Sequence, residues 1–275
     1  MGRRASDRDR AVKILVTNDD GVDAPGIAVL AAMLAGDGHD VLVVAPSTDR
    51  SGSGAALGQF WGSEPPPVTP VVWAAHPDLT VFSIDAPPGT AVLAAALGGF
   101  GDPPDLVVAG INPGANTGHL VVHSGTVGAA LTGVGLDIPG IAVSLMWADD
   151  GPYQWDTAAQ IALAAVDWAV KPDGGRPRLL NINVPNRALH ELEGVQETEL
   201  APHGEVWVAS ADVSTGDLRL DFKPRGDAAP GTDVGALQAG YVSVTPLMSV
   251  VRAPIAGAAE AVRHLLSPRV PHAAS

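Results

Sequence analysis

The chain of 275 residues contains no cysteine, and its 16 basic residues are far fewer than its 30 acidic ones. The absence of cysteine excludes disulfide bonds, thiolate metal ligands and a cysteine nucleophile. It is compatible with a reducing compartment, and we expect a cytoplasmic protein. The formal net charge of −14 disfavours a nucleic-acid duplex as partner, because such binding needs a basic surface.

Long apolar runs are also missing, since no run reaches the length that spans a bilayer, and we expect no membrane partner. Residues 1–11 are polar with charges of both signs, which predicts a disordered lead-in. Hydrophobic residues nevertheless make up 46% of the chain and charged residues 17%, values typical of a globular protein with a substantial core. The length suits either one large α/β domain or a domain with an appendage.

The most informative stretch lies near the N-terminus, where the apolar run 14–16 leads into Asn18, Asp19, Asp20 and Gly21. A short apolar run bounded by turn residues predicts a buried strand. In open α/β sheets, ligands bind outside the carboxyl ends of the strands. Adjacent carboxylates repel each other unless a cation lies between them. The stretch therefore indicates either a metal site or a solvated turn, and by itself it does not separate the two.

Strand and helix patterns alternate through the next part of the chain. We expect strands at 40–45, 71–75, 80–84, 106–109, 141–145 and 179–184, and helices at 27–34, 88–97, 124–135 and 156–170, with 59–70 as a loop. This alternation predicts a Rossmann-like α/β domain over residues 12–185, with a mostly parallel sheet and helices on both faces. The dinucleotide fingerprint is missing from the first turn, which disfavours a nicotinamide enzyme.

The character of the chain changes after residue 185, where charged and turn residues dominate as far as residue 233. Short β-like pieces such as 206–208 interrupt this segment, and a strand at 241–247 and a short helix at 258–266 follow. Residues 186–275 are therefore predicted to form a β-rich C-terminal extension that packs on the core and on a partner subunit. We expect strand 241–247 to bury one face and lend its edge to that partner.

Polar residues follow several of the predicted strands at the edge where a ligand is expected: Asp19, Asp20, Ser51, Asn112 and Asn116. An all-oxygen set of this kind suits Mg²⁺, Mn²⁺ or Ca²⁺ rather than Zn²⁺. Few protein carboxylates and many open positions suit a metal that shares its shell with water and a substrate phosphate.

A second feature, Ser124-Gly125-Thr126, opens the helix predicted at 124–135. Such a turn offers backbone N–H groups, two hydroxyls and the positive end of a helix dipole, all favourable to a phosphate group. Together with the oxygen set, it indicates metal-assisted hydrolysis of a phosphate ester.

The stretch Val-Thr-Asn-Asp-Asp-Gly-Val-Asp-Ala-Pro-Gly-Ile, residues 16–27, resembles the opening motif of the survival protein SurE family. Five later segments resemble further motifs of the family in the same order: 44–46 with 50–52, 104–112 with 114–116, 124–127, 183–185 and 240–247. The resemblance extends over residues 12–247, and six ordered motifs make a chance match improbable.

The resemblance implies a metal-dependent 5′/3′-nucleotidase that hydrolyses nucleoside monophosphates, assembles as a homodimer or homotetramer, and holds one divalent ion per subunit. It implies Mg²⁺ or Mn²⁺ as that ion, with Ca²⁺ as a further candidate. The implied metal ligands are Asp19, Asp20, Ser51 and Asn112. The implied phosphate contacts are Asn116, Ser124, Gly125 and Thr126, and the implied catalytic residues are Asp19, Asp20, Asn116 and Ser124.

The sequence departs from the family pattern at three places. Asp49 stands where relatives often have asparagine, His119-Leu120 stands where they often have acidic residues, and 248–252 lacks a frequent aspartate and histidine. These departures leave two alternatives open. The chain could be a specialised paralogue that acts on another phosphate ester, or a catalytically silent nucleotide-binding protein. A glycosyltransferase is disfavoured, because Asn18-Asp19-Asp20 does not supply the expected Asp-x-Asp.

Five further residues carry two readings each. His119 and His123 flank the predicted phosphate loop and act either as general acid or base or as surface histidines. Arg50 either holds a phosphate oxygen or pairs with a carboxylate. Trp61 and Trp73 either stack on a base or pack in the fold.

Overall fold

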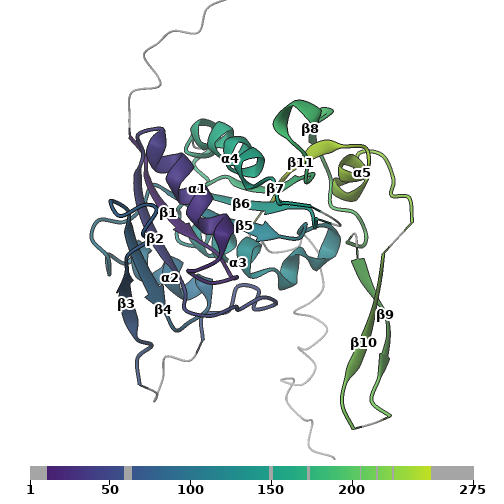
Figure 1. The fold of residues 1–275 in the computed structure, drawn as a ribbon, viewed down its shortest axis with the longest axis horizontal. Helices are drawn as coiled ribbons and strands as arrows, with labels where there is room; N and C mark the ends of the chain where they lie inside the picture. The colour runs from purple at the N-terminus through teal and green to yellow at the C-terminus, as the bar shows by residue number, and fades with distance from the viewer. Residues whose placement is uncertain are drawn as a thin grey trace, which may run out of the picture.

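The computed structural model describes residues 11–58, 64–148, 151–171, 174–204, 206–214, 216–224 and 226–248. Its main feature is a nine-stranded sheet of order β3-β4-β2-β1-β5-β6-β7-β11-β8, beside which stands a two-stranded sheet of β9 and β10 (Figure 1). The strands are β1 Lys13–Thr17, β2 Asp40–Pro46, β3 Val68–Val71, β4 Thr80–Ile84, β5 Leu106–Pro113, β6 Gly140–Leu145, β7 Leu179–Val184, β8 Gly194–Glu197, β9 Val206–Asp212, β10 Arg219–Pro224 and β11 Tyr241–Pro246. The α-helices are α1 Pro25–Gly36, α2 Pro88–Ala96, α3 Gly125–Val134, α4 Trp155–Ala169 and α5 Asp233–Gln238, with 3-10 turns at η2 Gly118–His123 and η3 Leu189–Glu191.

The centre of the main sheet is parallel and covered on both faces. Strand β1 pairs in parallel with β2 and β5, and β4, β6 and β7 continue the parallel arrangement. Ile14 and Val16 pack with α1 and α4, whereas Leu15 between them packs with α2 and α3 on the other face. Fully apolar strands with alternating partners are typical of such two-sided burial. The predicted α/β sheet with helices on both faces is confirmed, and the carboxyl ends of its parallel strands share one edge.

Two strands differ from the sequence-based expectation. Strand β3 occupies Val68–Val71, so the loop expected through residue 70 and the strand expected at 71–75 are wrong there. Pro70 is tolerated because β3 is an edge strand, which lacks a neighbour on one side. Strand β5 runs four residues beyond its expected end, because Asn112 and Pro113 resume pairing with β6 after an irregularity. Asn112 therefore lies in a strand and is fixed by the sheet.

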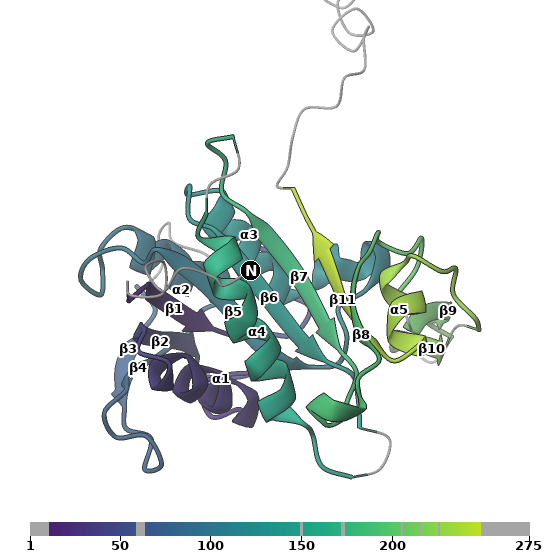
Figure 2. The same cartoon turned by 90° about the horizontal axis from the view of Figure 1, so that it is seen from above.

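The last part of the chain extends the main sheet (Figure 2). Strand β11 pairs with β7 in antiparallel fashion and with β8 in parallel. The expectation that this strand lends its edge to a partner is wrong, because both of its edges are taken within the chain. Its two faces are also filled: Val242 is buried on one face, and Ser243 and Thr245 are buried on the other, where their hydroxyls each lie 2.8 Å from that of Thr198. Strand β8 and helix α5 were not predicted from the sequence, because both are too short to show a clear periodicity of apolar residues.

Strands β9 and β10 form an antiparallel hairpin that stands away from the main sheet (Figure 1). The strand expected at 206–208 is confirmed as part of β9. The helix expected at 258–266 and residues 1–10 of the lead-in expected at 1–11 lie outside the described residues. Within the described segments, no helix combines the length and apolar character needed to cross a bilayer.

Candidate active site

A cavity of about 550 Å³ opens at the carboxyl edge of the parallel strands. Six of the eight predicted site residues line it: Asp19, Asp20, Ser51, Asn112, Asn116 and Ser124. They come from the turn after β1, the loop after β2, β5 and the loop that leads to α3. The volume lies in the range of pockets that hold small molecules. Gly125 and Thr126, the other two predicted residues, lie behind Asp19.

Asp19 is held by the first turn of α3. Its carboxylate, which is 3% exposed, accepts hydrogen bonds from the Gly125 N–H at 3.1 Å and from the Thr126 hydroxyl at 2.5 Å. Burial raises the pKa of Asp19, and these two bonds oppose the rise. A Cβ at Gly125 would lie 2.7 Å from Asp19, so only glycine lets α3 begin this close. The structure thus shows both residues supporting Asp19, and their direct phosphate contact stays a prediction.

Asp20 has an oxygen that the described protein groups do not satisfy. Its Oδ2 atom is buried and has no hydrogen-bond partner among the described residues. Burial raises the pKa of Asp20 to about 7, and the charges of Asp19 and Asp49 add to the rise. A partly buried carboxylate beside two others is stable in its charged form when a cation lies against it. This unpartnered oxygen fits a metal site.

The remaining candidate ligands complete an oxygen set rather than a cluster of acids. The Asn112 Nδ2 group donates to the Gly114 carbonyl at 2.6 Å, which leaves the amide oxygen of Asn112 for another partner. In the described part of the chain, no group of three His, Cys, Asp or Glu side chains could hold a metal. A metal here would therefore need Ser51 and Asn112 beside the two carboxylates, as the resemblance implied.

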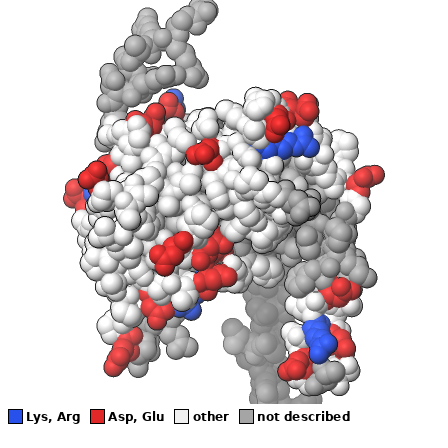
Figure 3. Space-filling model, viewed as in Figure 1, with Lys and Arg blue, Asp and Glu red and all other residues white. Residues whose placement is uncertain are grey.

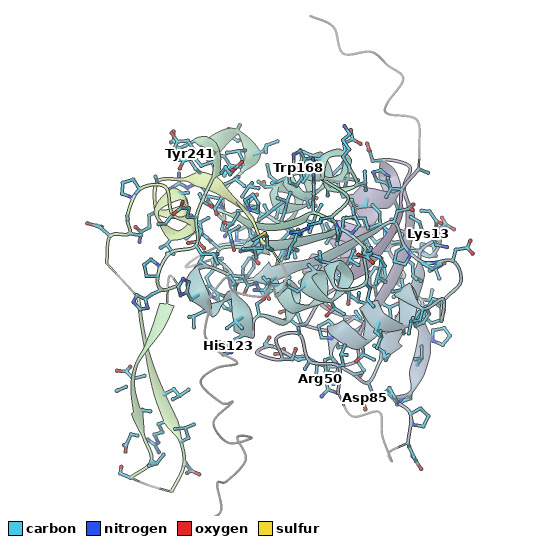
Figure 4. All side chains as sticks on the ribbon, turned by 180° about the vertical axis from the view of Figure 1, so that it is seen from behind. Lys13, Arg50, Asp85, His123, Trp168 and Tyr241 are labelled. Carbon is cyan, nitrogen blue, oxygen red and sulfur yellow. The ribbon has the colours of Figure 1, made fainter. Side chains whose placement is uncertain are left out.

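The loop after β2 is tied to the first turn. The Arg50 N–H donates to the Asp19 carbonyl at 2.7 Å, and the Arg50 guanidinium forms an ion pair with Asp85 (Figure 4). Of its two readings, the structure shows Arg50 paired with a carboxylate. Asp49 accepts hydrogen bonds from the side chain and backbone of Ser51, which lower the pKa of Asp49. Ser51 is therefore oriented by the residue at which this chain departs from its family.

Asn116 is held by buried side chains of the sheet. Its N–H donates to Asn183 Oδ1 at 2.7 Å, and its carbonyl accepts from Asn183 Nδ2 at 3.0 Å and from Asn181 Nδ2 at 2.8 Å. Its own Nδ2 group donates to Ser144 Oγ at 2.9 Å, which leaves a second N–H for a ligand. Sequence analysis missed the roles of Asn181, Asn183 and Ser144. The available signal was a set of polar residues inside apolar strands, since buried polar groups need partners.

The site loop, residues 114–124, links β5 to α3 and is also anchored to the C-terminal extension. The Gly118 N–H donates at 2.7 Å to Asp233, a fully buried carboxylate that also accepts from the Ala201 N–H at 2.9 Å. Gly118 has φ of 60°, and a Cβ there would lie 2.4 Å from the carbonyl carbon of His203. The extension therefore fixes the loop that carries Asn116 and Ser124, which the sequence did not indicate.

Ser124 and His123 lie where this loop meets the cavity. Ser124 caps α3, because its Oγ accepts from the Val127 N–H at 3.1 Å, and its own hydroxyl proton can still be donated. His123 is exposed and lines the cavity, whereas His119 is exposed and does not. Trp73 packs against the core, which decides between its two readings, and Trp61 lies outside the described residues.

The charge of the cavity is one-sided. Asp19, Asp20 and Asp49 line it, and its described wall includes neither lysine nor arginine. Acidic side chains also predominate over basic ones on the face shown in Figure 3. A phosphate dianion would be repelled by this wall unless a cation lay between them. The arrangement suits a cation-assisted reaction of a small phosphate ester.

Comparison with known proteins gives a consistent result. The profile of the family described as survival protein SurE matches residues 14–205. A protein named 5′-nucleotidase SurE from Stenotrophomonas maltophilia (strain K279a) is 36% identical over 241 residues, which cover 86% of this chain and 89% of that protein. One of the same name from Xanthomonas axonopodis pv. citri (strain 306) is 35% identical over 251 residues, with the same shares. The crystal structure of the SurE protein from Aquifex aeolicus aligns with a TM-score of 0.71 and 29% identity, over 92% of this chain and 99% of that one.

Proposed function

The chain belongs to the survival protein SurE family, and on that premise we propose that it is a 5′-nucleotidase, which hydrolyses nucleoside monophosphates to nucleoside and phosphate. The names of its relatives support the reaction. The observation that carries the proposal at this site is the cavity that joins Asp19 and Asp20 to hydroxyl and amide groups. Activity on 3′-monophosphates is a further part of the proposal.

We propose that one divalent ion per subunit, Mg²⁺ or Mn²⁺ with Ca²⁺ as a further candidate, is held by Asp19, Asp20, Ser51 and Asn112. When bound, such an ion would lower the pKa of a water molecule and neutralise charge on the phosphoryl group. The unpartnered Oδ2 atom of Asp20 and the absence of basic residues from the described cavity wall support this assignment.

Asn116 and Ser124 are proposed to orient the phosphate. Both line the cavity, and each has a hydrogen left to donate to a phosphate oxygen. The N-terminus of α3 adds a favourable dipole at the same place. The Gly125 N–H and the Thr126 hydroxyl already donate to Asp19 and would have to give up these bonds to donate to the phosphate. These two groups are therefore proposed to hold Asp19 in place, and a phosphate contact by Gly125 and Thr126 stays a prediction.

His123 is proposed to donate a proton to the departing oxygen of the ester. It is exposed and lines the cavity, and an imidazole can act as a general acid or base. His119 shares its sequence neighbourhood but not the cavity, so it serves as a matched control. The His123→Gln variant is expected to change the pH profile of kcat, whereas the His119→Gln variant is not.

The test of the proposed function is release of inorganic phosphate from a panel of esters. The panel holds nucleoside 5′- and 3′-monophosphates, ribose 5-phosphate and glycerol phosphate, each with Mn²⁺ or with a chelator. Metal-dependent hydrolysis of the nucleotides supports the proposal. Preference for another ester would favour the specialised paralogue, and inactivity on the whole panel would favour the silent binding protein.

We further propose that residues 12–185 form the catalytic domain, as expected from the sequence. Residues 186–275 would form the extension through which a homodimer or homotetramer assembles. Light scattering of the full chain at micromolar concentration tests the assembly, and a monomer would contradict it. The cytoplasmic location stays a prediction, for which cell fractionation is the test.

A further inference from the structure

The cavity has an apolar wall that neither the metal ligands nor the phosphate contacts explain. Trp147, which follows β6, is 60% exposed, and Leu120, in η2, is 44% exposed, yet both line the cavity. They come from segments that are distant in the sequence. Small-molecule sites usually combine apolar or aromatic walls with a few polar groups that fix orientation. The apolar wall therefore suits a ligand with an apolar or aromatic part besides its phosphate.

The position of Trp147 is built into the site. A Cβ at Gly114 would lie 2.8 Å from Cε2 and 2.9 Å from Cζ2 and Nε1 of the indole, so only glycine lets the ring lie this close. Gly114 also has φ of 121°, which strains any other residue. The Gly114 carbonyl accepts the side-chain N–H of Asn112 at 2.6 Å. The indole thus rests on a residue that directly contacts a proposed metal ligand.

The backbone around Trp147 keeps the ring beside the site. The Gly114 N–H donates to the Leu145 carbonyl at 2.7 Å, and Leu145 is the last residue of β6, two residues before Trp147. The end of β6, which leads to Trp147, is therefore joined to the loop that contains Gly114. The exposed part of the ring is available to a flat ligand.

We propose that Trp147 is the platform on which the base of the substrate nucleotide stacks, and that it determines specificity through the area of that base. The inference rests on the proposed function and adds the residue that recognises the nucleoside. Stacking on an aromatic ring tolerates every base, because every base has a π-face, and it strengthens with ring area. The protein should accept all common bases and favour purines over pyrimidines.

The test compares three variants, Trp147→Ala, Trp147→Phe and Trp168→Ala, in the full-length chain with Mn²⁺. Trp168 is a matched control: it is 44% exposed, lies on α4 and packs on Arg178 at 4.1 Å. Figure 4 shows it well apart from His123, which lines the cavity. The substrates are adenosine 5′-monophosphate, uridine 5′-monophosphate and ribose 5-phosphate, which carries the same sugar and phosphate without a base.

For Trp147→Ala, we expect kcat/KM for the adenine nucleotide to fall about 10-fold or more, mainly through KM, with a smaller fall for the uracil nucleotide. Trp147→Phe should retain most of the activity, and ribose 5-phosphate should be hydrolysed equally by all variants. An equal loss on ribose 5-phosphate, or no loss on either nucleotide, would overturn the inference. Inactivity of the unmodified protein on every substrate would instead overturn the proposed function, and the inference with it.

Discussion

The site loop and the β9–β10 hairpin are both connections outside the parallel core, yet they are held in opposite ways. The backbone of the site loop is bonded to buried side chains of two separate elements, through Asn181 and Asn183 of β7 and Asp233 of α5. The hairpin strands pair only with each other among the described strands, and Val213 and Leu218 are exposed apolar residues on it. The segment that bears the proposed chemistry is thus bonded to the body of the protein, whereas the described hairpin strands form no strand pairs with the main sheet.

Loss of a proposed metal ligand should lower the activity most. Asp20→Asn removes one charge with little change in volume, and we expect hydrolysis to fall by more than about 100-fold, since even residues behind metal ligands account for 10–100-fold. Asp23→Asn is the matched control, because Asp23 is exposed in the same turn and is not part of the described cavity wall. Phosphate-release rates measure both. Full activity of Asp20→Asn would show that the metal assignment is wrong.

A second substitution removes a side chain that holds the site loop but does not line the cavity. Asn183→Ala deletes the two hydrogen bonds that hold the backbone of Asn116, and we expect kcat to fall about 10–100-fold, as for other residues that orient a site. Asn181→Ala deletes one such bond and should cost less. Asn186→Ala is the control, because its side chain bonds to Gln154 and Pro152 instead.

A structural role alone would lower the melting temperature of Asn183→Ala and leave the kinetic constants of the folded fraction unchanged. Melting curves and kinetics are therefore measured on the same preparations. A variant that folds normally and keeps its kcat would show that the site loop does not depend on β7.

The sequence predicted the sheet and helices of the core because apolar periodicity is a local property of the chain. Six of the residues that it predicted for the site line the cavity, since residues such as Asp19, Ser51 and Asn112 lie at or after the carboxyl ends of parallel strands, which share one edge. It did not indicate Trp147 or Leu120 beside them. It could not predict the bonds from Asn183 to Asn116 and from Asp233 to Gly118, which join residues 67 and 115 positions apart.

The first turn of α3 shows a different limit of the sequence. Ser124, Gly125 and Thr126 were predicted to contact phosphate because any helix N-terminus attracts an anion. In the structure, the anion beside Gly125 and Thr126 is the Asp19 carboxylate of the same protein. The expectation that the N-terminus of α3 attracts an anion was correct. The sequence could not say whether that anion is the Asp19 carboxylate or a phosphate.

The third prediction concerns the free energy of unfolding. A partly buried carboxylate such as Asp20 destabilises the fold in its charged form when no cation lies against it. In the metal-free protein, the pKa of Asp20 is about 7 when folded and near the ordinary 3.8 when unfolded. The folded state therefore binds a proton that the unfolded state releases, and stability falls as the pH rises from about 4 through 7. Asp20→Asn lacks this charge and should gain roughly 1–3 kcal/mol over the unmodified protein at pH 8.

Urea unfolding in the presence of a chelator measures this gain. The difference between the two proteins should shrink as the pH falls from 8 to 5, because protonation of Asp20 makes them alike. Added Mn²⁺ should stabilise the unmodified protein alone. A gain that does not change with pH would show that burial of the Asp20 charge is not its cause.

The smallest effect on activity is expected at the hairpin. Replacing Val213, Leu218 and Leu220 by serine changes three exposed apolar side chains, so the free energy of unfolding should change by no more than about 0.5 kcal/mol for each. Phosphate release per chain should stay within about twofold, while light scattering should show a smaller assembly if the hairpin contacts a partner. Val72→Ser, at an exposed position after β3, is the control. An unchanged assembly would move the contact elsewhere in residues 186–275.

Calorimetric titration of Mn²⁺ into chelator-treated protein measures whether Asp19 and Asp20 hold a cation, whatever the substrate is. We expect one site per chain for the unmodified protein and for Asp23→Asn, and no detectable site for Asp20→Asn. Equal binding by all three proteins, or no binding by the unmodified one, would contradict this expectation.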